Sequence, residues 1–191
     1  MIATLSTKGS SGLTIAWSKV TGAKGYEVWA APCNTAKKKT SFKKVATIKG
    51  NKTNKWSDTG LKKHTAYKFR VKAYTVKDGK KRYIKVSPSL HAFTTGGNKK
   101  YTNAKSVKVN KTAVTVKKGK AAKIKASVIK LKKSKKLVSK AHAAKLRYLS
   151  TNKKVARVTK AGRIKGVGKG TCKVYVYAHN GVYKAVKVTV K

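Results

Sequence analysis

Short runs in which hydrophobic and polar residues alternate recur along the whole chain. The clearest are Leu13–Trp17, Tyr26–Ala30, Tyr67–Ala73, Cys172–Ala178 and Val186–Val190. Successive side chains of a β-strand point to opposite faces, so a period of two predicts strands with one buried and one solvent-facing side. Turns rich in Gly, Asn and Lys separate the runs at a spacing of about 8–12 residues, which is typical of sandwiches and barrels. We therefore predict an all-β fold.

A break in this alternation divides the chain near its middle. Gly96 and Gly97 interrupt the pattern, and the next alternating run begins at Val107. Each half is long enough to bury its own core. The predicted parts are a first domain, a linker and a second domain, residues 1–96, 97–103 and 104–191. Another irregular stretch, 130–145, is rich in lysine and lacks a hydrophobic face, so we interpret it as a long solvated loop.

The charge of the chain is its most unusual feature. Among 191 residues there are 50 Lys and Arg but only 3 Asp and Glu, a formal net charge of +47. Hydrophobic residues still make up 40% of the chain, which is more than a disordered polycation contains. These charges repel one another, so we expect low salt to weaken the fold and bound polyanions to stabilise it.

One basic segment is TNKKVARVTKAGRIKGVGKG, residues 151–170, in which seven of the twenty residues are Lys or Arg and none is acidic. Val155 and Ile164 punctuate its lysines, and AGRIKG reads as a turn followed by a short strand. The basic side chains are therefore predicted to lie on the solvent side of strands and in turns. The candidate polyanion-binding residues are Lys153, Lys154, Arg157, Lys160, Arg163, Lys165 and Lys169.

Several side chains fall on the strand face opposite the predicted core. The aromatic residues on this face are Trp29, Tyr175 and Tyr177, which are therefore candidates for stacking against sugars or bases. The alternative is that they cover an outer sheet face or a domain junction. Glu27 falls on the same face and is expected to point outward, away from Tyr26 and Val28.

Residues that could support catalysis or bind a metal are few and scattered. The three acidic residues are far apart in sequence, as are the four histidines, so neither a carboxylate pair nor a metal site is indicated. Cys33 and Cys172 form no CxxC motif and are interpreted as separate buried thiols. We predict a protein that is not an enzyme and has no cofactor and no metal. Nothing resembles a signal peptide or a membrane span, so the chain is expected to carry neither.

The first half resembles a fibronectin type III domain. The resemblance rests on LTIAW (13–17), GYEVWAA (25–31) and KWSDTGLKKHTAYKFRVKAY (55–74), followed by FTT (93–95). Leu61 and Tyr67 match the tyrosine corner of that family. The cell-attachment sequence Arg-Gly-Asp of some members is absent, so no integrin-binding function is implied.

The second half resembles a group 2 bacterial immunoglobulin-like domain, through SVKVNKTAVTVKKGK (106–120), LRYLSTNKKVARVTKAGRIKGVGKGTCKVYVYA (146–178) and VKVTV (186–190). Together the two resemblances imply two tandem immunoglobulin-like β-sandwiches. They also imply a module of a secreted or cell-surface bacterial protein, used for adhesion or spacing.

Charge and resemblance together lead to a functional hypothesis. Only five of the basic residues are Arg, and 45 are Lys. Lysine is a hydrated point charge, which favours diffuse attraction to polyanions over specific recognition. We expect a non-enzymatic extracellular or surface module that binds teichoic acid, an acidic glycan or extracellular DNA through many lysine contacts. The alternatives are an inert spacer and a dedicated nucleic-acid-binding protein, against which the low Arg content argues.

Overall fold

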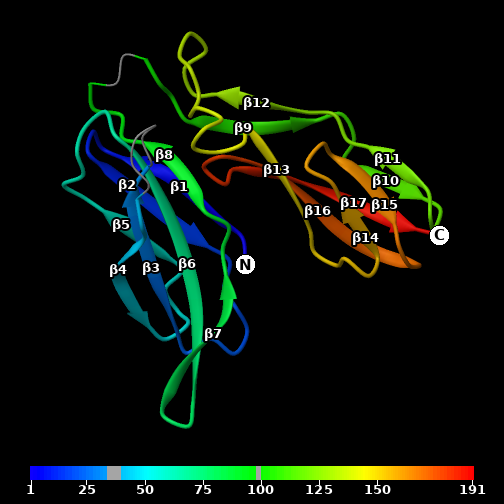
Figure 1. Cartoon of the computed structure of the whole chain (residues 1–191), viewed down its shortest axis with the longest axis horizontal. Coiled ribbons are helices and arrows are strands. Elements are labelled where there is room, and N and C mark those ends of the chain that lie inside the picture. Colours follow the sequence, from blue (N-terminus) through cyan, green and yellow to red (C-terminus); the bar gives the residue numbers. More distant parts are fainter. Residues whose placement is uncertain (34–39, 98–99) are drawn as a thin grey trace. The chain divides into compact units, whose positions relative to one another are not determined.

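The computed structural model describes residues 1–33, 40–97 and 100–191, in which every regular element is a β-strand (Figure 1). The strands form two compact units. Unit 1 comprises Met1–Asn103 and Lys135–Ala143, and unit 2 comprises Ala104–Ser134 and Ala144–Lys191. The prediction of an all-β chain with two β-sandwiches in tandem is confirmed.

Unit 1 is built from two antiparallel sheets. One has the strand order β1-β2-β5, and the other has the order β4-β3-β6-β7, with β8 pairing to the first part of β6. The strands are β1 (Ala3–Lys8), β2 (Gly12–Trp17), β3 (Gly25–Pro32), β4 (Lys43–Lys49), β5 (Lys55–Asp58), β6 (Ala66–Lys77), β7 (Lys80–Val86) and β8 (Leu90–Phe93).

The alternating residues of these strands fill the core of unit 1. Ile15, Val28 and Val71 are fully buried there. The Trp17 and Tyr26 rings pack with their centroids 5.2 Å apart. The tyrosine corner is also present, because the Lys62 backbone N–H donates to the Tyr67 hydroxyl over 3.1 Å. The period-two pattern therefore identified the buried face of these strands correctly.

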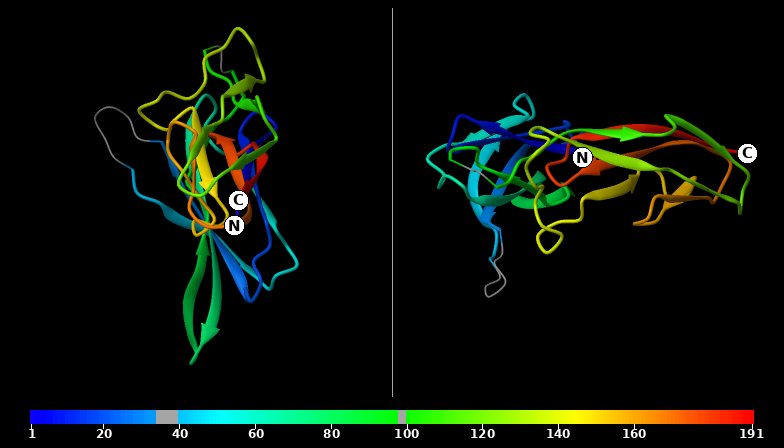
Figure 2. Two further views of the ribbon diagram at one scale, coloured as in Figure 1. Left: turned by 90° about the vertical axis from the view of Figure 1, so that its right-hand side faces the viewer. Right: turned by 90° about the horizontal axis from the view of Figure 1, so that it is seen from above.

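The β6–β7 hairpin extends beyond the neighbouring strands (Figures 1 and 2). Asp78 and Gly79 form its two-residue turn, with φ angles of 52° and 69°. Two successive positive φ angles match the right-handed twist of the paired strands, and Asp-Gly is a favoured sequence for such a turn. All residues of β7 are exposed and several are Lys or Arg, which discourages pairing of this edge with another chain. The hairpin brings β7 side chains over the outer face of β3.

The lysine-rich stretch 130–145 differs from the solvated loop that we expected. Its central part, Lys135–Ala143, belongs to unit 1 although it lies between strands of unit 2. The Thr102 backbone N–H donates to the Lys136 carbonyl over 2.8 Å, and Val138 is only 6% exposed. No alternation marks this segment because it makes few strand-like contacts. Its burial depends on residues distant in sequence.

Unit 2 consists of three sheets with strand orders β10-β17-β16-β13, β11-β15-β14 and β12-β9. Its core is rich in valine, and Val174, Val176, Val186 and Val188 are fully buried. The strands are β9 (Ala104–Val109), β10 (Ala113–Val116), β11 (Ala121–Lys123), β12 (Ala126–Lys130), β13 (Leu146–Ser150), β14 (Ala156–Val158), β15 (Arg163–Gly166), β16 (Gly170–Ala178) and β17 (Tyr183–Val190).

We predict that the Lys135–Ala143 segment stabilises unit 1. Val138 packs in a small hydrophobic cluster with Phe93 and Ala143. Changing Val138 to Ala should lower the free energy of unfolding by about 2 kcal/mol, because two buried methyl groups are lost. All three tryptophans lie in unit 1, so their fluorescence during urea unfolding reports on this unit alone.

Val45→Ala is the matched control, because Val45 is 40% exposed and the same atoms are removed. It should change stability by no more than about 0.5 kcal/mol. Equal effects of the two substitutions would show that the segment contributes nothing to unit 1.

Candidate functional site

The sheet β11-β15-β14 places like charges side by side on its outer face. Arg157 of β14 lies directly opposite Lys165 of β15, and Arg163 of β15 lies opposite Lys123 of β11. All four side chains are exposed. Directly opposed residues in an antiparallel pair have Cβ atoms about 5 Å apart, and like charges in such pairs are destabilising. The inward-facing Ile164 is fully buried, so the register of the sheet holds the charges outward.

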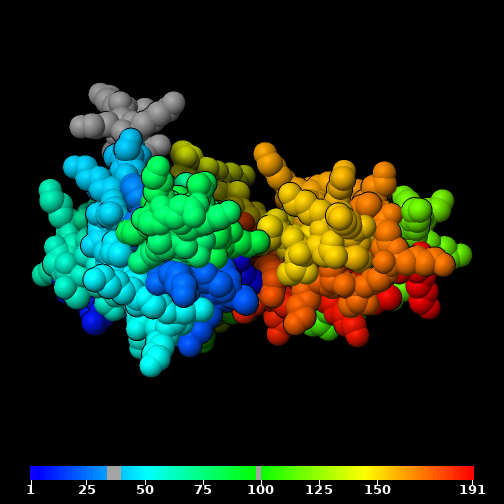
Figure 3. All heavy atoms as spheres, turned by 90° about the horizontal axis from the view of Figure 1, so that it is seen from below, coloured from blue at the N-terminus to red at the C-terminus, as the bar shows by residue number. Residues whose placement is uncertain are grey.

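The other predicted basic residues lie in the turns around this sheet. They are Lys153 and Lys154 before β14, Lys160 between β14 and β15, and Lys169 before β16, and all are exposed. Side chains of this segment, coloured yellow to orange, project from unit 2 in Figure 3. We use the term basic surface for the seven predicted residues together with Lys123. Within the described part of the chain, their charged groups form no ion pair or hydrogen bond.

Local hydrogen bonds explain how the turns present these lysines. The Asn152 side-chain oxygen accepts the Lys154 backbone N–H over 3.0 Å and closes the turn before β14. Gly162 has φ of 77°, and a Cβ at this position would lie 2.8 Å from the Ile124 carbonyl oxygen. Only glycine satisfies both conditions, so the tight connection into β15 depends on it.

Lys123 is the member of the basic surface that the sequence did not reveal. It ends a three-residue strand, AAK, which is too short to show an alternating pattern. Its neighbour Arg163 is distant in sequence, and the register of β11 against β15 brings them together. A single sequence contains no signal for that pairing.

A cleft of about 510 Å³ lies between β13 and β14 at one side of the basic surface. Two of the predicted basic residues, Lys153 and Arg157, line it. The remaining lining residues are Tyr148, Leu149, Ser150 and Val158. The cleft therefore combines positive charge with an aromatic ring and two aliphatic residues, and none of the described residues that line it is acidic.

The three candidate stacking aromatics are half-buried, and each ring contacts another side chain. Tyr175 packs edge-on against Tyr183, with 5.1 Å between the ring centroids. The Arg147 guanidinium lies 4.7 Å from the centroid of Tyr177. Tyr175 and Tyr177 are on β16, in a different sheet from the strands of the basic surface. The structure therefore does not place these two rings on the same sheet face as the lysines.

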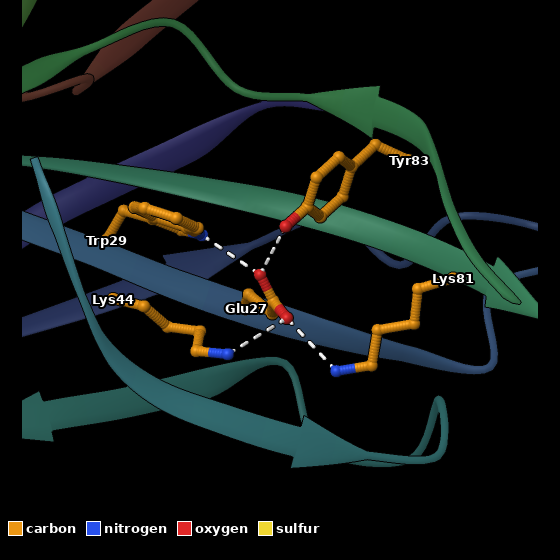
Figure 4. Close-up of polar contacts among 5 residues, drawn as sticks. All are labelled: Glu27, Trp29, Lys44, Lys81 and Tyr83. Carbon is orange, nitrogen blue, oxygen red and sulfur yellow. Dashed lines mark hydrogen bonds and ion pairs between the residues drawn. The ribbon is translucent and has the colours of Figure 1, made fainter.

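Trp29 belongs to a polar cluster on the outer face of unit 1, which we call the Glu27 cluster (Figure 4). Its members are Glu27, Trp29, Lys44, Lys81 and Tyr83. The Glu27 carboxylate accepts hydrogen bonds from the Tyr83 hydroxyl at 2.6 Å, from Lys81 at 3.1 Å and from the Trp29 indole at 3.2 Å. Lys44 forms an ion pair with it at 3.6 Å.

Glu27 points outward, as expected, but the cluster shields its carboxylate from solvent. Its side chain does lie on the face opposite the core, but it is only 2% exposed. The β6–β7 hairpin brings Lys81 and Tyr83 over it. Burial by itself raises the pKa of Glu27, but the hydrogen bonds from Tyr83 and Lys81 and the nearby Lys charges outweigh this effect. The pKa therefore lies below its usual value, and the group is ionised at pH 7.

The aromatic rings of this face also cover lysine ammonium groups. Lys72 lies 3.8 Å from the Trp29 ring centroid and 4.7 Å from that of Tyr83. Lys81 lies 4.6 Å from the Tyr74 ring. Such cation–π contacts are favourable, so the cations on this face have partners within unit 1. We interpret the Glu27 cluster as a structural network that fastens the hairpin to the sheet.

Cys33, Cys172 and His179 are buried. Cys33 and Cys172 are separate buried thiols, as predicted, and burial raises the pKa of Cys33 to about 12. Burial and the Arg147 charge lower the pKa of His179 to about 4, so this imidazole is neutral at pH 7. Among residues 1–33, 40–97 and 100–191, no three His, Cys, Asp or Glu side chains are grouped to hold a metal ion. The same residues include no helix long and apolar enough to span a membrane.

The two halves of the chain match the models of two domain families. Residues 3–87 match the model of the fibronectin type III domain, and residues 103–190 match that of the group 2 bacterial Ig-like domain. The chain matches none of the curated proteins. Similar solved structures include the fn3 domain of human contactin 1, with 15% identity and a TM-score of 0.38 over 50% of this chain and 76% of that chain. Another is the third fibronectin III domain of human KIAA0343 protein, with 16% identity and a TM-score of 0.37 over 50% and 86% of the two chains.

We predict that the Glu27 carboxylate stabilises unit 1 through its charge. Glu27→Gln keeps the shape of the side chain but removes the charge that Lys44 and Lys81 neutralise. The free energy of unfolding, followed by tryptophan fluorescence at pH 7, should fall by about 2 kcal/mol. Tyr83→Phe removes one hydrogen bond and leaves the carboxylate in place, so this variant should lose less unfolding free energy, about 1 kcal/mol.

The stability of unit 1 should depend on pH, because the pKa of Glu27 is lowered in the folded state. The Glu27 carboxylate binds a proton more readily in the unfolded state than in the folded state. Its stabilisation of unit 1 is therefore present above the pKa that Glu27 has in the unfolded state, and is lost as the pH falls through its pKa in the folded state. The difference in unfolding free energy between wild type and Glu27→Gln should therefore become smaller below about pH 4. A variant as stable as wild type at pH 7 would contradict a stabilising role for the carboxylate.

Proposed function

Because the chain consists of a fibronectin type III domain followed by a group 2 bacterial Ig-like domain, we propose that it is a surface module that binds anionic polymers. Both families are non-catalytic and typical of extracellular or surface proteins, so both indicate a structural or cell-surface role. The finer role, adhesion to a polyanion through lysine, is our proposal. Teichoic acids, acidic glycans and extracellular DNA have the required charge.

The observation that carries the proposal is the outer face of β11-β15-β14. Its opposed pairs, Arg157 with Lys165 and Arg163 with Lys123, have no carboxylate or aromatic partner in the described chain. Bringing like charges together costs stability, and a bound polyanion removes that cost. The contrast with unit 1 supports this interpretation, since Lys44 and Lys81 there have Glu27 as a partner.

The chemistry of the basic residues favours multivalent over sequence-specific binding. Each lysine contributes a weak, salt-sensitive contact, and a polymer that engages many of them gains in effective concentration. Arg, whose planar fork suits bidentate contacts to base edges, is scarce in this chain, so DNA is expected to bind without sequence preference. A pure spacer would show no binding to any polymer at physiological salt.

Binding should be measured against teichoic acid, a heparin-like glycan, duplex DNA and a neutral glycan, at about 50 and 200 mM salt. We expect binding to all three polyanions, with an affinity that falls steeply as salt rises, and no binding to the neutral glycan. Absence of binding to every polyanion at both salt concentrations would overturn the proposal and favour the spacer.

The basic surface should contribute more than lysines chosen elsewhere. Changing Lys123, Arg157, Arg163 and Lys165 to Gln should make the slope of log affinity against log salt shallower by roughly 3. The control variant changes four exposed lysines of unit 1 to Gln and has the same net charge: Lys8, Lys19, Lys52 and Lys55. Equal losses in the two variants would assign binding to the whole charge of the chain, not to this surface.

A further inference from the structure

The cleft between β13 and β14 is a concave site at one side of the basic surface. β13 is the last strand of the sheet β10-β17-β16-β13, and β14 is the last strand of β11-β15-β14. The cleft therefore opens where the edges of two sheets meet. We propose that it is a subsite for one anionic sugar or polyol unit of the bound polymer, an inference that rests on the proposed function.

The lining of the cleft suits a polyol that also has an apolar face. Leu149 and Val158 provide aliphatic surface, and Tyr148 provides a hydroxyl group. The hydroxyl of the buried Ser150 accepts the Asn152 backbone N–H over 3.2 Å, so Ser150 contributes to the wall of the cleft. Burial raises the pKa of Tyr148, so its phenol stays protonated at neutral pH and can donate a hydrogen bond. Sugars present C–H groups on their ring faces and hydroxyls at their edges. A few polar groups set among apolar ones are typical of small-ligand sites.

The charged residues of the cleft specify an anion. Arg157 is one of only five arginines in a chain of 45 lysines. Its planar guanidinium can bind two oxygens of a carboxylate or phosphate at once, which a lysine cannot do. Arg147, by contrast, is engaged with the Tyr177 ring and the His179 carbonyl. Lys153, which also lines the cleft, supplies a second positive charge.

The shared chemistry of the ligand is a carboxylate or phosphate attached to a polyol. Uronic acid glycans and polyol phosphate polymers both contain such units. The bases of duplex DNA are stacked and paired, so DNA can reach the basic surface with its phosphates but cannot place a base or sugar ring in the cleft. The subsite therefore favours acidic glycans and polyol phosphates over duplex DNA.

The first test is an NMR titration of the full chain with glucuronate, glycerol phosphate and neutral glucose. We expect the backbone amides of Ser150, Lys153 and Arg157 to shift and saturate with one or both anionic probes, with a dissociation constant in the millimolar range or weaker. The two anionic probes distinguish a carboxylate from a phosphate source. Glucose should leave these amides unshifted. Shifts spread evenly over all exposed lysines, without saturation, would overturn the subsite.

Paired variants give a second and independent test, measured with the acidic glycan or teichoic acid that binds wild type. Lys153→Gln and Lys154→Gln remove the same charge from adjacent residues, but only Lys153 lines the cleft. Arg157→Lys and Arg163→Lys both keep the charge, but only Arg157 lines the cleft. We expect each variant of a cleft residue to weaken binding about fivefold more than the matched variant outside the cleft.

Equal effects within each pair, together with intact polymer binding by wild type, would refute the subsite and leave the proposed function standing. Polymer binding that fails in wild type would refute the proposed function instead. In that case the monomer titration alone would decide on the subsite, since saturable shifts at the cleft would support it and their absence would overturn it.

Discussion

Uncompensated positive charge is the constraint on which the rest of this structure depends. With 50 basic and 3 acidic residues, the chain can neutralise few of its lysines internally. Burying an unpaired charge costs several kcal/mol, so the fold is possible only if the basic side chains stay on outer faces and in turns. The alternating pattern achieves this, because it assigns valine and other apolar residues to one side of each strand and lysine to the other. The valine-rich core of unit 2 contains none of the charge.

The two units handle this charge in different ways. In unit 1 the outer face of β3 and β6 has partners of its own, since Glu27 binds Lys44 and Lys81 while Lys72 lies between the Trp29 and Tyr83 rings. On the β11-β15-β14 face of unit 2, Arg and Lys lie opposite one another without such partners. The first arrangement stabilises a hairpin. The second leaves a surface that a bound anion would stabilise, which is why we propose polymer binding by unit 2.

The strand pattern predicted the sandwiches, the buried faces and the exposure of all seven basic residues between 151 and 170. It could not predict contacts that depend on how strands pair. Lys123 joins the basic surface only through the register of β11, and Glu27 is buried only because a distant hairpin covers it. The same limit applies to Val138, whose partner Phe93 is far away in sequence. Periodicity within one strand reveals which face a side chain is on, but not what covers that face.

The most direct test of the account is the melting temperature of the chain, followed by circular dichroism as salt and polyanion are varied. The self-repulsion of a charge of +47 is long-ranged at about 10 mM salt and is strongly screened at about 150 mM. We predict that the melting temperature rises with salt over this range, and that a heparin-like glycan raises it further at the low salt concentration. A melting temperature that stays unchanged or falls, both with added salt and with the glycan, would contradict the account. It would show that the charge neither destabilises the fold nor binds polyanions.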